Sequence, residues 1–316
     1  MLSVAAFWST HAASTTMPPR SLGDFTPGLR ATVNNVDNVN FDSLTFTDSQ
    51  TSGTAQVSVD TLALDGVSPF RAGARAEAGS LGVASEGLPF RGPGDQVGAS
   101  ARYADMVGIT SSGETGFGNL TLDFALEGTM DVVRSSSAGL FFIFEYAIPD
   151  GGLTALPTEL TPTIMGSGFE ELAFADELIV TPEPIFFDGF ISTALLFGMV
   201  DDSSNPGLTP FDGIVTIEVP FIFGEGAFFS ATLTAETNGP DFIDALGSAD
   251  LVSVLVEQGG NAVQDAVVTG QVGGDLAAVA AANSSDVPLA LPGAFLVAAI
   301  GALFVPRRQS PEQMPV

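Results

Sequence analysis

The chain has 316 residues, 45% of them hydrophobic, so it can bury a core, and global disorder is excluded. It carries 37 Asp or Glu against nine basic residues, all arginine, and the net charge of -28 excludes nucleic-acid binding, which needs a basic face. Because it has no Cys and one His, thiol nucleophiles, zinc fingers and most histidine-based triads are excluded as well.

Residues 1–22 begin with a short apolar segment that has no basic residue before it. A secretory leader normally opens with such a basic region. We therefore interpret residues 1–22 as the remnant of a leader whose true start codon lies upstream of Met1, or as a disordered N-terminus.

Residues 23–274 form the expected body, and their dominant period is two. Asn119–Glu127 places Leu120, Leu122, Phe124 and Leu126 on one face and polar residues on the other, as a half-buried antiparallel strand requires. Similar alternation predicts further strands at Phe41–Thr47, Gln56–Leu64, Arg71–Ala84, Gln96–Val107, Gly213–Phe223, Phe228–Glu236 and Leu251–Glu257.

Two other segments of the body depart from this alternation. Leu140–Ile148 is more continuously apolar than the other runs, which indicates a central strand buried on both faces. Pro149–Pro220 contains eight prolines and should be mostly loop and edge strand. Together these patterns predict an all-β antiparallel sandwich, jelly-roll-like or related, without an internal repeat.

Carboxylates are the candidate chemical groups of the body. Asp37 and Asp42 lie in one stretch rich in Asp and Asn, and Asp201 and Asp202 lie in another. Clustered oxygen ligands suit calcium, so these four residues are the candidate metal ligands, although Asp and Asn also simply form turns. We expect no other cofactor.

Paired carboxylates can also hydrolyse glycosides without Cys or His. Glu170 with Glu171 and Asp176 with Glu177 are adjacent pairs, as are Asp201 with Asp202. Neighbours on a strand point to opposite faces, so adjacency in sequence does not create a pair in space. Solvated loop acids account for these residues, and we expect no enzyme.

The C-terminal region changes character after residue 274. Residues 275–286 are small and polar, as in a linker, and Leu289–Val305 is a run of 17 residues without a charge. Arg307 and Arg308 follow directly, and basic residues beside an apolar span remain cytoplasmic. We expect one transmembrane helix over 289–305 and a cytoplasmic tail over 309–316. The alternative is a buried core helix.

Residues 287–308 resemble the C-terminal sorting signals of the PEP-CTERM class, in the variant that opens with Val-Pro-Leu-Pro-Ala. Val287, Pro288 and Leu289 match the opening, and Arg307 and Arg308 match the basic end. The sequence departs from the variant after Leu289, where Ala-Leu-Pro replaces Pro-Ala. The resemblance implies processing by an exosortase-type membrane protease and export to the envelope, often alongside exopolysaccharide.

A literal Pro-Glu-Pro at 182–184 is the rival signal. The apolar residues that follow it end at Asp201 and Asp202, the opposite of a basic flank, so we reject it.

The sequence and the resemblance together predict an exported surface or extracellular-matrix protein of a Gram-negative bacterium. It is anchored in the membrane by a single pass before processing, and its role is structural or adhesive. The alternative is a carbohydrate- or calcium-binding domain. Only one Trp and two Tyr, Tyr103 and Tyr146, could stack on sugars, which disfavours an aromatic sugar platform.

Overall fold

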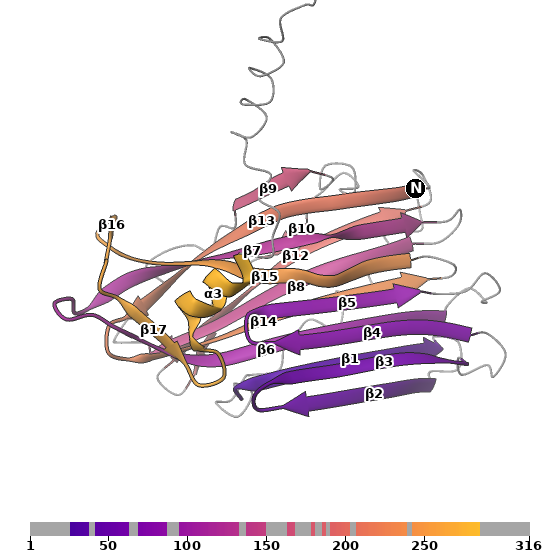
Figure 1. The fold of residues 1–316 in the computed structure, drawn as a ribbon, viewed down its shortest axis with the longest axis horizontal. Helices are drawn as coiled ribbons and strands as arrows, with labels where there is room; N and C mark the ends of the chain where they lie inside the picture. Colours follow the sequence, from indigo (N-terminus) through magenta and orange to yellow (C-terminus); the bar gives the residue numbers. More distant parts are fainter. Residues whose placement is uncertain are drawn as a thin grey trace, which may run out of the picture. The chain divides into compact units, whose positions relative to one another are not determined.

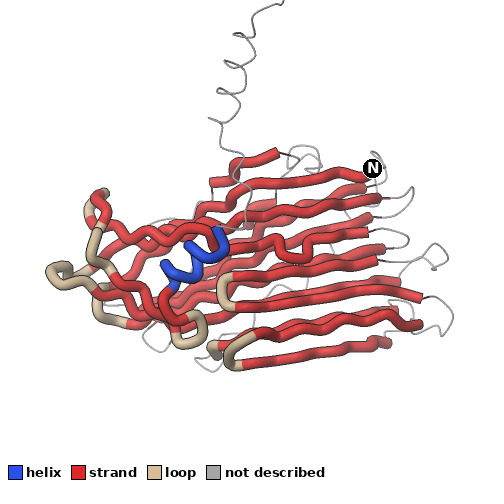
Figure 2. Tube along the Cα trace, in the orientation of Figure 1, coloured by secondary structure: helices blue, strands red, loops and turns tan. Residues whose placement is uncertain are grey.

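Two antiparallel sheets and one short helix make up the part of the chain that the computed structural model describes (Figures 1 and 2). The described residues are 26–37, 42–62, 69–86, 95–132, 137–149, 163–167, 178–180, 185–187, 190–202, 207–238 and 242–284. The prediction of an all-β body is confirmed.

The first sheet, sheet A, has ten strands, and its main path runs β10-β12-β8-β14-β6-β1-β2. Beside this path β11 pairs with β12, while β17 pairs with β6 and β18. The strands are β1 (Gly28–Asp37), β2 (Asp42–Gln50), β6 (Asp95–Thr110), β8 (Ser137–Pro149), β10 (Leu178–Val180), β11 (Ile185–Phe187), β12 (Phe190–Asp202), β14 (Gly226–Asn238), β17 (Val267–Gly270) and β18 (Gly274–Asp275).

The second sheet, sheet B, has eight strands in the order β3-β4-β5-β15-β7-β13-β9, and β16 pairs with β15. The strands are β3 (Thr54–Leu62), β4 (Pro69–Glu77), β5 (Ser80–Glu86), β7 (Phe117–Val132), β9 (Thr163–Ser167), β13 (Gly207–Ile222), β15 (Phe242–Gln258) and β16 (Asn261–Ala262).

Four strand pairs are nested along the chain. β5 pairs with β15 and β7 with β13 in sheet B, while β6 pairs with β14 and β8 with β12 in sheet A. Strands β5 to β8 thus alternate between the two sheets along the chain, and strands β12 to β15 pair with them in reverse order. All of these pairs are antiparallel.

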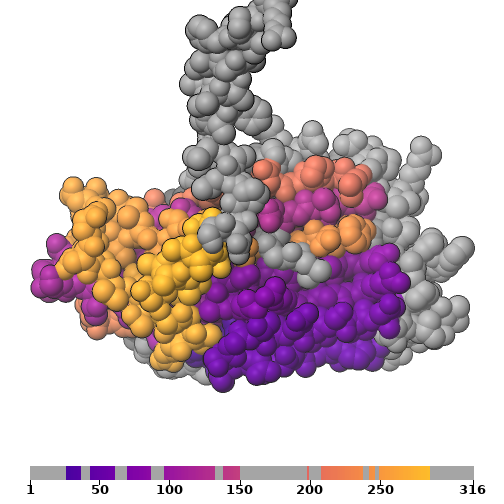
Figure 3. All heavy atoms as spheres, viewed as in Figure 1, coloured from indigo at the N-terminus to yellow at the C-terminus, as the bar shows by residue number. Residues whose placement is uncertain are grey.

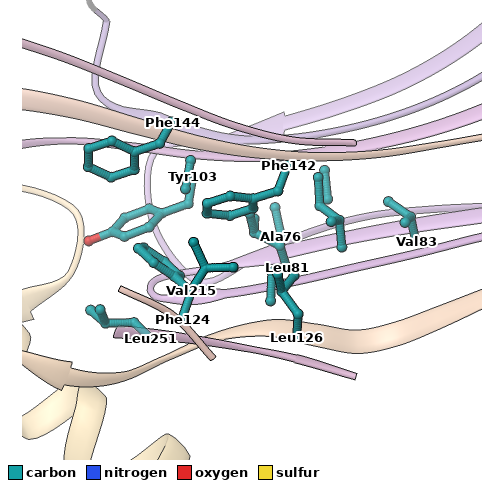
Figure 4. Close-up of a cluster of buried hydrophobic side chains, with 14 of the residues drawn as sticks. Ala76, Leu81, Val83, Tyr103, Phe124, Leu126, Phe142, Phe144, Val215 and Leu251 are labelled. Atoms are coloured by element: carbon teal, nitrogen blue, oxygen red, sulfur yellow. The ribbon is translucent and has the colours of Figure 1, made fainter. Parts of the chain in front are cut away.

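The apolar residues of the alternating pattern form the hydrophobic core between the two sheets. In β7 the inward residues Leu120, Leu122 and Phe124 are at most 2% exposed. Phe124 packs against rings from the opposite sheet, with centroid distances of 5.1 Å to Phe142 and 6.1 Å to Phe144 (Figure 4). Each fully buried apolar side chain contributes about 1.5–3 kcal/mol, so this alternation supplies much of the stability of the sandwich.

Phenylalanine and glycine form recurring cross-strand pairs. Gly118 and Gly128 of β7 are in register with Phe221 and Phe211 of β13. A Cβ built on either glycine would lie 2.6 Å from the Cζ atom of its partner ring. Each ring therefore occupies the space over its glycine, which explains part of the combination of 36 Gly with 25 Phe.

The C-terminal segment 259–284 packs beside strand β15. Residues 275–286, predicted as a linker, instead contain helix α3 (Leu276–Ser284), whose Leu276 and Ala280 are buried. The Nδ2 group of Asn283 donates to the carbonyl oxygens of Gly79 (2.9 Å) and Leu251 (3.1 Å). In Figure 3 this segment, orange to yellow, lies against the early strands, in purple. Residues 275–284 of the predicted linker therefore belong to the body, and residues 285 and 286 lie outside the described residues.

Two predictions for the strands need correction. The single run predicted at Arg71–Ala84 is a hairpin of β4 and β5, because the chain turns at Gly79 with φ of +71°. Within Pro149–Pro220, predicted as mostly loop and edge strand, two long strands are paired on both sides: β12 pairs with β8 and with the short β10 and β11, and β13 pairs with β7 and β9. The other predicted strands are confirmed, with shifted ends. β8 is central as expected, but it is not fully buried on both faces, because Phe141, Ile143 and Glu145 on its outer face are only half-buried.

The predicted transmembrane helix at 289–305 lies outside the described residues. Within those residues, no helix is long and apolar enough to cross a membrane.

Candidate binding surface

The register of sheet A places the predicted calcium ligands. Asp37 and Asp42 are directly opposite each other on β1 and β2, whereas Asp202 on β12 is in register with Ser137 on β8. Four interstrand steps separate β1 from β12, roughly 19 Å at about 4.8 Å a step. The structure therefore brings Asp37 and Asp42 together, but Asp201 and Asp202 cannot share an ion with them.

Several predicted site residues lie outside the described part of the chain. These are the acidic pairs Glu170–Glu171 and Asp176–Glu177 and the signal residues Val287, Pro288, Leu289, Arg307 and Arg308. Among the described residues, no group of three or more His, Cys, Asp or Glu could hold a metal ion.

Asp105 is a buried carboxylate that the sequence reasoning missed. It faces the core from β6 at 0% exposure, and Tyr103 Oη donates to its Oδ2 atom at 2.7 Å. The backbone N–H groups of Val272 and Gly273 donate to Oδ1 at 3.0 Å and Oδ2 at 2.9 Å. This carboxylate therefore holds the turn that leads from β17 to α3. The sequence does contain a signal for Asp105, namely a charged residue at a position of β6 that faces the core.

Both tyrosines belong to the core. Tyr103 is 0% exposed and Tyr146 is 1% exposed, so neither can offer a ring face to a sugar. Burial raises the pKa of both phenols, and for Tyr103 the neighbouring Asp105 adds to the effect. Recognition at the surface of the described strands therefore cannot use stacking on a tyrosine ring.

Asp265 joins two exposed loops. Its carboxylate accepts hydrogen bonds from the hydroxyl and the backbone N–H of Ser112, the latter at 2.9 Å, and from the hydroxyl of Ser111 at 2.9 Å. These bonds, led by that of the Ser112 hydroxyl, lower the pKa of Asp265 from its usual 3.8 to about 2.

We expect an acid-dependent contribution from this contact. A carboxyl with a lowered folded-state pKa stabilises the fold above its unfolded pKa and loses that effect as the pH falls through the folded value. The melting temperature difference between wild type and Asp265→Asn should therefore shrink from pH 3.8 to about pH 2. Glu114→Gln, which removes an exposed charge from the same loop, is the control, and a pH-independent difference for Asp265→Asn would contradict the assignment.

The outer face of sheet A carries two neighbouring polar rows, which we call the outer patch. In one row, Arg30 of β1 lies directly opposite Arg102 of β6. Ser49 of β2 and Thr232 of β14 extend this row on either side. Like charges placed directly opposite each other on neighbouring strands repel each other.

Hydroxyl groups make up the second row of the outer patch. Thr47, Thr32, Ser100 and Thr234 are in register across β2, β1, β6 and β14. The hydroxyls of Thr32 and Thr47 lie 3.3 Å apart, and Thr234 donates to Ser100 at 3.1 Å. The two rows are two residues apart along the strands, which corresponds to about 7 Å. The outer patch thus presents hydroxyls and guanidinium groups side by side.

The arginines of sheet B are arranged differently. Arg71 Nε lies 3.2 Å from Asp60 Oδ2, and Arg75 Nη2 lies 2.5 Å from Glu77 Oε1. On sheet A, Arg102 Nε donates to Ser230 Oγ at 2.9 Å, and Ser230 is in register with Glu145 of β8. No acidic residue of the described strands neighbours Arg30 on its face. The neighbours of Arg30 there are Gly28, Thr32, Thr47, Ser49, Ser100, Arg102 and Ala104.

No family model matches the chain, and neither a curated protein nor a solved structure matches it.

Proposed function

We propose that the chain is an exported surface or matrix protein, anchored by a C-terminal transmembrane helix and processed there by an exosortase-type protease. Its role is structural or adhesive. The observation that carries this proposal is the order of three features at the C-terminus: Val287-Pro288-Leu289, the uncharged run to Val305, and then Arg307 and Arg308.

The body supports this proposal through its architecture. Long antiparallel strands packed around one core form a rigid scaffold for surface-exposed faces. The nested order of β5–β8 and β12–β15 supports a sandwich of the jelly-roll type, a fold that hosts many unrelated functions. The function therefore has to be argued from the signal and from the surface, since the fold alone does not decide it.

The strongly negative charge of the chain is consistent with a location outside the cytoplasm. With no lysine and a net charge of -28, the exterior repels other copies of the chain and tolerates high salt, because screening relieves its self-repulsion. Such a protein remains soluble at a crowded surface.

Processing of the signal is the decisive test. In a host that carries an exosortase, replacing Val287 and Pro288 by alanine should abolish cleavage and leave membrane insertion intact, since the apolar run is unchanged. Replacing Arg307 and Arg308 by glutamate should instead weaken orientation and retention. The measurement is the mass of the C-terminal fragment and its share in the membrane fraction.

The matched control uses the rival signal. Alanine at Pro182 and Pro184 makes the same kind of change at Pro-Glu-Pro and should leave processing as in wild type. If wild type and the Val287, Pro288 variant both retain an uncleaved segment, the sorting proposal is wrong and a plain anchor remains.

A further inference from the structure

We infer that strand β2 is a self-association edge, through which two copies of the chain pair antiparallel and sheet A of one copy continues into sheet A of the other. The two-fold axis of this pair passes through Phe46, the middle residue of Asp42–Gln50. The inference goes beyond the proposed function and does not depend on the C-terminal signal, because it concerns the strands of the body alone.

β2 is the outermost strand of sheet A on one side, at the lower border of the ribbon in Figure 1. It pairs with β1 along its full length, and no strand or turn among the described residues pairs with its other side. In an antiparallel strand, every second residue directs its backbone N–H and C=O groups away from the neighbouring strand. β2 therefore offers a row of backbone donors and acceptors to a further strand.

The adjacent edge of sheet B is protected. Its outermost strand is β3, where the backbone N–H of Gln56 donates to Oδ2 of Asp48 at 3.0 Å. The other carboxylate oxygen of Asp48, Oδ1, accepts a hydrogen bond from Gln50 Nε2 at 2.9 Å. A charge on the inner face of an edge strand usually hinders pairing, but both oxygens of Asp48 already have donors within the chain. Asp48 thus covers part of the β3 edge and leaves β2 able to pair.

The sequence of β2 is complementary to itself when Phe46 is the central residue. The opposite residues are then Phe46 with Phe46, Thr45 with Thr47, Leu44 with Asp48, Ser43 with Ser49, and Asp42 with Gln50 of the second copy. All nine residues are paired, and no two like charges are opposite each other. Hydroxyl residues meet on the outer face, where such cross-strand pairs are stabilising. The half-buried Leu44 and Phe46 become further covered.

Other registers of this pair are less favourable. Opposite residues must lie on the same face of the sheet, so the neighbouring registers are centred on Thr45 or on Thr47. The register centred on Thr45 pairs only residues 42–48 and places Asp42 opposite Asp48. The register centred on Thr47 pairs only residues 44–50. The sequence of β2 therefore selects a single symmetric pairing, as an interface between identical copies requires.

The charge distribution also favours this side of the sandwich. The net charge of -28 repels a second copy, and it is spread unevenly over the described residues. Outside β1–β4, these residues carry one arginine against 19 carboxylates. In β1–β4, three arginines (Arg30, Arg71 and Arg75) face five carboxylates (Asp37, Asp42, Asp48, Asp60 and Glu77). Two copies that meet at β2 therefore keep their most acidic parts apart.

Cysteine cross-linking tests the register, since the chain contains no Cys of its own. The experiment mixes purified full-length Ser43→Cys and Ser49→Cys chains in a nonionic detergent and adds a short bismaleimide reagent. Both serines are exposed, and cysteine is close to serine in size. We expect cross-linked dimers that contain one chain of each kind, because opposite Cβ atoms lie about 5 Å apart. Either variant alone should remain uncross-linked, since its two thiols lie six residues apart along the strands, roughly 20 Å.

A charge variant tests the edge itself. Thr45→Asp combined with Thr47→Asp places carboxylates directly opposite each other in the pair, so it should weaken self-association by about 10-fold. The measurement is sedimentation equilibrium of the full-length chain in density-matched detergent. Association of the wild type should strengthen between about 0.05 M and about 0.5 M NaCl, because salt screens the repulsion between the copies.

Gln264→Glu combined with Gln271→Glu is the matched control. It adds the same two charges at exposed positions of the C-terminal segment and should leave self-association unchanged. The melting temperature and far-UV circular-dichroism spectrum verify the fold of each variant. Equal cross-linking of the mixture and of either Cys variant alone, or wild-type association of the Thr45, Thr47 variant, would overturn the inference, as would a wild type that stays monomeric at every concentration. None of these results bears on processing of the C-terminal signal, which is measured separately in cells.

Discussion

Replacing Asp105 by alanine should destabilise the body by about 3 kcal/mol or more, since a buried hydrogen-bonding group left without its partner costs about 1–3 kcal/mol. Three donors would lose their acceptor: the hydroxyl of Tyr103 and the backbone N–H groups of Val272 and Gly273. The measurement is the midpoint of urea unfolding of the full-length chain, with unchanged slope as the check on two-state behaviour.

The two buried tyrosines provide a matched control for this prediction. Tyr103→Phe removes a hydroxyl that donates to Asp105, whereas Tyr146→Phe removes one that has no hydrogen-bond partner among the described residues. We expect Tyr103→Phe to lower the unfolding free energy and Tyr146→Phe to leave it unchanged or raise it. Similar effects of the two changes would show that Asp105 does not organise this region.

Gly270 and Gly273 show how closely the chain surrounds Asp105. A Cβ on Gly270 would lie 2.1 Å from Asp105 Oδ2, and one on Gly273 would lie 2.5 Å from Tyr103 Oη. The turn between β17 and α3 therefore requires glycine at both positions because of close approach. The carboxylate and the glycines act as one unit that attaches the C-terminal segment to sheet A.

Much of the strand pattern could be predicted from the sequence because one face of each strand is buried. β7, β6 and β14 alternate between apolar and polar residues, and their positions were predicted to within a few residues. β12 was missed because Ile191–Val200 is mostly apolar without alternation and lies in a proline-rich region. β4 and β5 were merged because alanine and glycine occupy both faces around their turn.

Helix α3 was missed because it consists mostly of alanine and has no clear polar face. The sequence does contain a signal for the start of this helix. The carboxylate of Asp275 accepts hydrogen bonds from the N–H groups of Ala277 (3.0 Å) and Ala278 (3.2 Å), as an N-cap residue does. An Asp before a run of good helix formers could have predicted this helix.

The outer patch could not be predicted from the sequence. Arg30 and Arg102 are 72 positions apart, and the register of β1 against β6 brings them together. Alternation assigns each arginine to the solvent face of its own strand, but it does not determine which strands are neighbours or which residues are opposite. The same limit applies to Asp37 and Asp42, whose pairing depends on the β1–β2 register.

Replacing Gly128 by alanine should destabilise the body by about 1–3 kcal/mol, the usual cost of overpacking a well-packed core. The added Cβ would lie 2.6 Å from the carbonyl oxygen of Asp244 on β15 and 2.6 Å from Cζ of Phe211 on β13. Because the Asp244 oxygen belongs to the backbone, β7 and β15 would have to move apart, and the strain would extend into the centre of sheet B. Thermal unfolding of the full-length variant measures the cost.

Gly108 of β6 is the matched control for Gly128. It is also a strand glycine, but a Cβ there would have no atom within 4 Å. Gly108→Ala should therefore stabilise the body by about 0.4–1 kcal/mol, because alanine reduces the conformational freedom of the unfolded chain. A smaller ring at position 211, as in Phe211→Leu, should recover part of the loss in Gly128→Ala, since one of the two close contacts is then relieved. If both alanine variants melt at the same temperature, the close packing assigned to β7 between β13 and β15 is wrong.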